Sequence, residues 1–247
     1  MKNFELISFT TADELAQAVA GAWLDEIEAA NRAGKTHCVA LSGGRIARKF
    51  FASVVEQATA RKIGDGDTPS FPENVHFFWA DERCVPPDDP ESNFHLAKEL
   101  LFGPLKIGDA QIHRIRGEDS PEAAAKAASA EIVQIAPLNE ASQPVFDIIF
   151  LGMGEDGHVA SLFLGEPDVL ILDKVIYRAV KNSPKPPPNR VTLGYTTITL
   201  AKQVWVLVSG AGKETVLCES LSSQGRTPLA RVTQFRTRTK IFSATFH

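Results

Sequence analysis

Runs of apolar residues that end at small or charged residues recur along the chain. They occur in the segments THCVALSGG, NVHFFWADER, FDIIFLGMGEDG and QVWVLVSGAGK, and each is expected to precede a helix, as IARKFFASVVEQA follows the first. Strand, glycine turn and helix form the repeating unit of a parallel α/β sheet. In open α/β sheets ligands bind outside the carboxyl ends of the strands, so the four polar strand ends are expected to form one cleft.

Two further segments carry strong helix signals. Thr11 and Glu14 have the spacing of a capping box. The apolar residues that follow recur at helical spacing: Leu15, Ala18, Val19, Ala22, Trp23 and Ile27. Ser120 is placed to cap SPEAAAKAASAEIVQIA, and NSPKPPPNR is expected to be a loop. No repeat or linker divides the chain, which predicts a single α/β domain over residues 1–247.

Three glycines in the segment LGMGEDGHVASLFLG have the G-x-G-x-x-G spacing of a dinucleotide-binding turn. Such a turn needs a long helix after the third glycine and an acidic residue about 20 positions on, at the end of the next strand. Pro167 would cut that helix short, and Asp173 precedes the strand-like segment KVIYRAV instead of ending it. The glycines are therefore interpreted as a turn that presents His158 beside two carboxylates.

The other strand ends carry groups suited to an anion. Asp81, Glu82 and Arg83 either form a solvated loop or place an arginine where it can clamp a phosphate. The glycine turn in LSGGRIARKF precedes a helix whose N-terminus attracts an anion. Lys213 could add positive charge at the fourth strand end. A nucleotide-binding P-loop is not expected there, because Leu207 stands where the motif needs glycine.

Composition narrows the class of protein. The chain has 247 residues, 44% of them hydrophobic, and a formal net charge of -4, which argues against nucleic acid or an anionic membrane as partner. There is no leader-like start and no apolar run approaching about 20 residues, so a cytoplasmic location is expected. Cys38, Cys84 and Cys218 are odd in number and have no C-x-x-C spacing, so neither a disulfide framework nor a zinc site is expected.

Four segments together resemble the 6-phosphogluconolactonases. They are FDIIFLGMGEDGHVASLFLG, WADERCVP with ESN after it, SPKPPPNRVTL and VWVLVSGAGK, in the order seen in that family. GMGEDGHVASLF and SPKPPPNRVTL are the specific matches, and the resemblance spans nearly the whole chain. It implies a parallel-rich sheet between helices, in the fold of glucosamine-6-phosphate deaminases and ribose-5-phosphate isomerase-like proteins. It also implies hydrolysis of 6-phospho-D-glucono-1,5-lactone to 6-phosphogluconate in the pentose phosphate pathway, without an obligatory metal or organic cofactor.

The resemblance also implies roles for single residues. His158 would be the general base, with Asp156 as its neighbour in the loop. The candidate residues for the anionic substrate are Ser42, Gly43, Gly44, Arg45, Asp81, Arg83, Arg190 and Lys213. The family usually continues the paired glycines with Ser-Thr-Pro, whereas this chain has Arg45, Ile46 and Ala47. Arg45 either compensates for the two missing hydroxyl donors or fills the pocket.

The chemistry can be argued from histidine alone. An imidazole with a pKa near 6.5 can take a proton from water at pH 7 and return it to the departing ring oxygen. No serine nucleophile is required, and Ser161 is interpreted as a packing residue in a short helix rather than an acyl carrier.

Two other functions stay open beside the lactonase. The first is an isomerase or deaminase of the same fold, whose pattern has an acid five residues after the histidine, where this chain has Phe163. The second is a non-catalytic protein that binds sugar phosphates. For the lactonase we expect a small-molecule sugar-phosphate lactone as partner and a monomer or weak homodimer.

Overall fold

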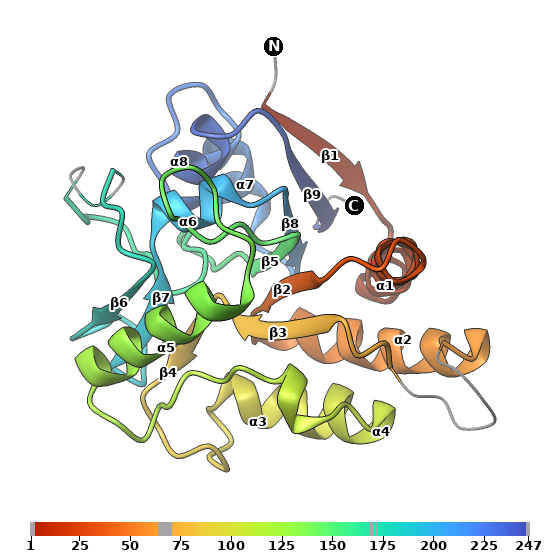
Figure 1. Cartoon of the computed structure of the whole chain (residues 1–247). Coiled ribbons are helices and arrows are strands. Elements are labelled where there is room, and N and C mark those ends of the chain that lie inside the picture. The colour runs from red at the N-terminus through yellow and green to blue at the C-terminus, as the bar shows by residue number, and fades with distance from the viewer. Residues whose placement is uncertain (1–2, 64–70, 168–169, 171, 246–247) are drawn as a thin grey trace.

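A six-stranded parallel sheet forms the centre of the computed structural model, which describes residues 3–63, 71–167, 170 and 172–245 (Figure 1). In spatial order the strands are β1 (Phe4–Ser8), β9 (Thr239–Ala244), β8 (Gln203–Ser209), β5 (Ile148–Gly152), β2 (His37–Leu41) and β3 (Val75–Trp79). The four strands predicted from the sequence are β8, β5, β2 and β3, which are neighbours and pair in parallel. Their carboxyl ends therefore meet at one edge of the sheet.

Helices cover both faces of this sheet (Figure 1). The long helices are α1 (Ala12–Arg32), α2 (Arg45–Arg61) and α5 (Pro121–Ile135). The short ones are α3 (Asn93–Ala97), η1 (Lys98–Phe102), α4 (Gly103–Leu105), η2 (Asp109–Gln111), α6 (Tyr195–Leu200), α7 (Glu214–Ser220) and α8 (Pro228–Gln234). In Figure 1, α1 and α2 lie to the right of the sheet, and α5 to α8 lie to its left. The predicted fold class, a parallel-rich sheet flanked by helices, is confirmed.

The capping box of α1 is present as predicted. The backbone N–H of Glu14 donates to Thr11 Oγ1 at 3.1 Å, and the Glu14 carboxylate accepts from the backbone N–H of Thr11 at 3.3 Å. The apolar residues that recur at helical spacing were expected to pack in the core, which was partly wrong, because Ala18 is exposed and Ala22 is only half-buried. Three other residues of the helix are buried: Ala16, Ala20 and Leu24. They belong to the next row of side chains, so the face in contact with the sheet and α2 is rotated from the predicted one.

A second, three-stranded sheet has the order β4-β7-β6 and lies beside the first. Its strands are β4 (Asp81–Arg83), β7 (Arg190–Leu193) and β6 (Tyr177–Val180). The strand-like segment KVIYRAV is confirmed in its second half, which forms β6. The expectation that a helix follows β3 was wrong, because the chain continues into β4, which pairs antiparallel with β7 and sets Arg83 opposite Arg190. That pairing brings two basic residues far apart in the sequence to one place.

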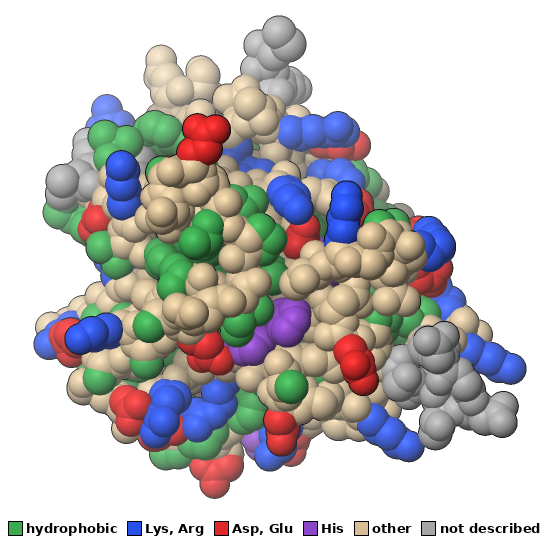
Figure 2. Space-filling model, viewed as in Figure 1, with side chains coloured by type: hydrophobic (Ala, Val, Ile, Leu, Met, Phe, Trp, Pro, Cys, Tyr) green, Lys and Arg blue, Asp and Glu red, His purple; other side chains and the backbone are tan. Residues whose placement is uncertain are grey.

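Charged groups of both signs are interspersed on the face shown in Figure 2. Within the described part of the chain, no helix is long and apolar enough to cross a membrane. The same residues contain no group of three or more His, Cys, Asp or Glu side chains arranged to hold a metal ion. Cys38, Cys84 and Cys218 are free thiols. The absence of nucleic-acid and membrane partners stays a prediction.

Candidate active site

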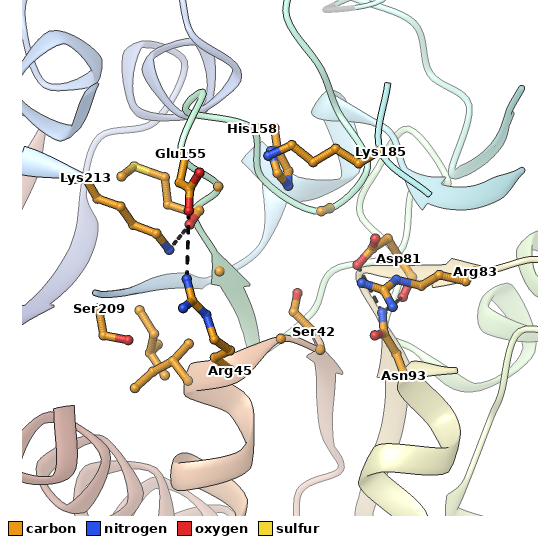
Figure 3. A pocket seen from close by; sticks show the side chains of 18 of the residues that line it. Ser42, Arg45, Asp81, Arg83, Asn93, Glu155, His158, Lys185, Ser209 and Lys213 are labelled. Atoms are coloured by element: carbon orange, nitrogen blue, oxygen red, sulfur yellow. Dashed lines mark hydrogen bonds and ion pairs between the residues drawn. The ribbon is translucent and has the colours of Figure 1, made fainter. Parts of the chain in front are cut away.

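A cavity of about 320 Å³ opens at the carboxyl edge of the central sheet, and all four predicted strand ends contribute to it. Of the ten candidate residues, nine line the cavity: Ser42, Gly43, Gly44, Arg45, Asp81, Arg83, His158, Arg190 and Lys213. Asp156, the tenth, is bound to His158. Figure 3 shows Arg45 and Lys213 on one side of the cavity and Arg83 on the other, with His158 and Lys185 above them. The structure thus brings the candidates together, and their individual roles stay predictions.

The glycine loop after β5 forms a tight turn that presents His158. The backbone N–H of Gly154 donates to the carbonyl of His158 at 2.9 Å, which closes the turn. A Cβ added to Gly154 would lie 2.0 Å from the imidazole Cε1, so only glycine leaves room for this ring. Residues 153–165, all described, contain no helix. The loop therefore lacks the helix of a dinucleotide-binding turn, and the short helix predicted around Ser161 was wrong.

His158 is held by Asp156 and shares it with a lysine. His158 Nδ1 lies 2.5 Å from Asp156 Oδ1, and Lys185 Nζ lies 3.3 Å from the same oxygen. Because Nδ1–H donates to the carboxylate, Nε2 is the nitrogen left to accept a proton. Burial lowers the pKa of His158 below its usual value, although Asp156 acts in the opposite direction. The imidazole is therefore neutral at pH 7 and has the form that a general base requires.

Asp81 lies inside the protein and not in a solvated loop. It is 5% exposed, and its Oδ2 accepts a hydrogen bond of 2.6 Å from Ser161 Oγ. Ser161 is fully buried. A fully buried hydroxyl is not accessible to a substrate carbonyl, which favours the interpretation of Ser161 as a packing residue and not an acyl carrier.

Arg190 uses most of its donors within the protein. Its Nε donates to the carbonyl of Pro187, and its Nη2 donates to the carbonyls of Lys185 and Pro186, at 2.8–3.2 Å. Nη1 donates to Ser161 Oγ at 3.3 Å and lies 3.9 Å from Asp81 Oδ2. The side chain is therefore a clamp on the predicted loop NSPKPPPNR. Its role as a ligand of the substrate anion stays a prediction.

Asn93 lines the cavity and was not a candidate. Its Nδ2 donates to the carbonyl of Asp81 at 2.9 Å, and its side chain fills the space that a Cβ on Gly43 would need. Buried Glu82 fixes this region, because its carboxylate accepts from three backbone N–H groups and from the Ser92 hydroxyl. Burial raises the pKa of Glu82 to about 7. Asn93 belongs to the segment ESN, which resembles the family motif, and this match was the signal that could have identified it.

The turn after β2 departs from the expected phosphate site in one detail. Ser42 Oγ donates to the carbonyl of Phe150 at 2.8 Å, so its hydrogen is already used. Gly44 has a φ of 98°, which favours glycine, and α2 begins at Arg45. The Arg45 side chain is 84% exposed, and its Nη2 lies 3.9 Å from a carboxylate oxygen of Glu155. Arg45 therefore lies at the mouth of the cavity and does not fill it, which favours compensation.

Lys213 lies on the same side of the cavity as Arg45 and comes directly before α7. Its Nζ donates to the carbonyl of Met153 at 2.6 Å, which ties it to the loop that carries His158. Burial lowers the pKa of Lys213, and the nearby Arg45 adds to this effect. A bound anion would stabilise both cations, and their role as a phosphate site stays a prediction.

Comparison with known proteins gives the same assignment as the motifs. The model of the glucosamine-6-phosphate isomerase/6-phosphogluconolactonase family matches residues 10–241. A 6-phosphogluconolactonase of Streptomyces coelicolor is 32% identical over 227 residues, which cover 90% of this chain and 84% of the relative. The solved structure of 6-phosphogluconolactonase from Trypanosoma brucei has a TM-score of 0.80 at 26% identity, covering 97% of this chain and 96% of that one.

A structure of a monomeric glucosamine-6-phosphate deaminase has a TM-score of 0.76 and covers 96% of each chain. At 18% identity this likeness shows the fold alone. The resemblance found in the sequence is confirmed by the family match and by the relatives together. The chain therefore belongs to the glucosamine-6-phosphate isomerase/6-phosphogluconolactonase family and, within it, to the 6-phosphogluconolactonases.

Proposed function

We propose that this chain hydrolyses 6-phospho-D-glucono-1,5-lactone to 6-phosphogluconate, as a step of the pentose phosphate pathway. The family supplies the substrate class. The observation that carries the proposal is the pair of His158 and Asp156 on a cavity rich in positive charge. Among the described residues that line this cavity, five are Lys or Arg and two are Asp or Glu. A base beside a cationic cavity fits an anionic ester better than a neutral one.

The proposed mechanism uses His158 Nε2 twice. Nε2 takes a proton from a water molecule as its oxygen attacks the lactone carbonyl, and Asp156 stabilises the imidazolium that forms. The cations around the cavity offset the negative charge on the carbonyl oxygen. When the bond between the carbonyl carbon and the ring oxygen breaks, the imidazolium returns the proton to that oxygen. One water is consumed, and the product acid ionises to the carboxylate.

The isomerase or deaminase alternative lacks a carboxylate at the position that would serve ring opening. Phe163 stands there, and its ring centroid lies 5.0 Å from that of His158. The alternative of a non-catalytic binding protein rests only on the unusual turn at Arg45. One assay separates these functions from the lactonase: consumption of the lactone above its spontaneous rate. No acceleration, with 6-phosphogluconate still bound, would favour the binding protein.

Loss of a cavity cation is expected to weaken substrate binding. Arg83→Ala and Lys213→Ala should each reduce affinity by about 1.5–3 kcal/mol if the group donates a charged hydrogen bond to the phosphate. The measurement is the dissociation constant of 6-phosphogluconate, by calorimetry. Arg116→Ala, at an exposed site outside the cavity lining, is the matched control and should bind normally.

The same reading makes unphosphorylated gluconolactone a poor substrate. Equal kcat/KM for the two lactones would show that the cavity does not recognise an anion. Arg83→Ala and Lys213→Ala can also be tested with unphosphorylated gluconate. If they lose as much affinity for gluconate as for 6-phosphogluconate, the cations bind the sugar and not its phosphate.

Arg45→Ser is expected to weaken binding of 6-phosphogluconate by about 3- to 10-fold, because an exposed guanidinium contributes about 1 kcal/mol. The serine restores one family hydroxyl but not the Thr-Pro that usually follows. Arg48→Ser removes the same charge from an exposed position of α2 that does not line the cavity, and serves as control. Tighter binding by Arg45→Ser would instead mean that Arg45 obstructs the phosphate.

Two further parts of the proposal concern the setting of the enzyme. We place it in the cytoplasm and expect a monomer or weak homodimer, acting on a small-molecule lactone. The proposed steps use only side chains of this chain, with no organic cofactor or metal taking part.

A further inference from the structure

The loop NSPKPPPNR is built around one side chain that points back to the catalytic pair. Lys185 lines the cavity, and its backbone is fixed from two sides. Its carbonyl accepts from Ser183 Oγ at 2.9 Å and from Arg190 Nη2 at 3.2 Å, and its N–H donates to Ser183 Oγ at 3.2 Å. A loop held in this way places the lysine at a defined position and not at random over the cavity.

The ammonium group of Lys185 reaches the carboxylate that orients the base. Nζ lies 3.3 Å from Asp156 Oδ1, the oxygen that also accepts from His158 Nδ1. One carboxylate oxygen is therefore shared by a permanent cation and by the group that becomes a cation during the reaction. The positive charge of Lys185 offsets part of the charge that would stabilise an imidazolium.

We propose that Lys185 is a positioning residue that acts on His158 through Asp156: by sharing Oδ1 it fixes the carboxylate partner of the imidazole and adds to the effect of burial in favouring the neutral resting ring. This inference rests on the proposed function for its meaning in catalysis. Its physical content, the effect of Lys185 on the charge of His158, is independent of the substrate. The motif SPKPPPNR thus has a chemical purpose beyond forming a loop.

The other charged groups around His158 do not replace this effect. Two acids favour the protonated form of His158. They are Asp156, in the same loop as His158, and Asp81 of β4. The Phe163 ring packs against the His158 imidazole. Arg190 lies over the Phe163 ring, with its Cζ 5.8 Å from the ring centroid. Burial is the main cause that lowers the pKa of His158, and the positive charge of Lys185 lowers it further.

The test is the titration of the His158 imidazole by NMR in the unliganded protein, with the signal assigned from His158→Gln. Lys185→Met should raise the midpoint by about one pH unit, because it removes a nearby positive charge that disfavours the protonated imidazole. Lys185→Arg keeps the charge and should restore most of the wild-type midpoint. Lys181→Met removes an exposed lysine that lies directly before this loop and is paired with Glu122 of α5, and it should leave the midpoint unchanged.

Activity gives the second readout. The acid limb of the kcat/KM profile should move to higher pH by the same amount, so the ratio of wild-type to Lys185→Met activity should be about tenfold larger below both midpoints than above them. The loss that remains above both midpoints measures the part of this cavity cation in binding substrate. In an Asp156→Asn background the shift caused by Lys185→Met should fall to less than half. A purely structural role would instead lower activity equally at every pH.

Two results would overturn the inference. The first is an unchanged His158 midpoint in folded Lys185→Met, and Lys185→Gln repeats the measurement should the methionine variant not fold. The second is an undiminished shift in the Asp156→Asn background, which would mean that Lys185 acts directly and not through the carboxylate. If the wild-type protein does not accelerate lactone hydrolysis, the proposed function fails while the titration still decides the role of Lys185.

Discussion

Changing His158 to alanine is expected to lower turnover by about 10²-fold or more while the protein stays folded, because general-base assistance typically contributes 10²–10⁴-fold. The imidazole lies on the cavity wall, and its hydrogen bond to Asp156 leaves Nε2 as the proton acceptor. Its removal leaves the cations that bind substrate in place. We therefore expect kcat to fall much more than KM rises, measured as lactone consumption after subtraction of the spontaneous rate.

The control for this variant is His95→Ala, which deletes a partly exposed imidazole outside the described cavity lining and should keep normal turnover. A second check is chemical rescue. Imidazole added to His158→Ala should restore part of the rate, because the truncated side chain leaves space beside Asp156. Near-normal turnover in the folded His158→Ala protein would remove the residue from the role of base.

The strand ends were predictable because buried parallel strands have a simple sequence pattern. Each apolar run that ends at a glycine or a charge marks where a strand leaves the core, as at Leu41 and Gly152. Parallel pairing then brings these ends to one edge regardless of loop structure. For this reason the candidates at the four strand ends lie on one cavity, although they come from separate parts of the sequence, and Arg190 joins them through the antiparallel pairing of β7 with β4.

The remaining parts of the site depend on contacts between distant segments. Asp81 belongs to a strand only because β4 pairs with β7, more than a hundred residues away. Asn93 reaches the cavity because buried Glu82 holds the segment before it, and Lys185 does so because Arg190 binds its loop. Local periodicity contains no information on such contacts. The motif matches ESN and SPKPPPNR were the only signals for these two residues within the described site.

Replacing Arg190 with methionine is expected to destabilise the protein by about 3–5 kcal/mol, because it leaves a buried acid without its cation. Arg190 is 4% exposed and Asp81 is 5% exposed. Three carbonyls of the loop that carries Lys185 would also lose a donor, and of these the Lys185 carbonyl keeps its bond from Ser183 Oγ. Methionine keeps much of the side-chain volume, so the loss reports the guanidinium and not a cavity. The measurement is the free energy of unfolding in urea.

Matched variants separate the buried charge from the loop contacts. Arg116→Met removes an exposed arginine paired with Asp119 and should cost less than about 1 kcal/mol. Asp81→Asn in the Arg190→Met background removes the stranded charge, so the double variant should be more stable than the sum of the two single changes predicts. Arg190→Lys keeps the charge but lacks the planar guanidinium that donates to three carbonyls. Its free energy of unfolding should lie between those of the wild type and Arg190→Met. A loss below about 1 kcal/mol for Arg190→Met would mean that water satisfies Asp81 and the loop carbonyls, and that the guanidinium is free to bind substrate instead.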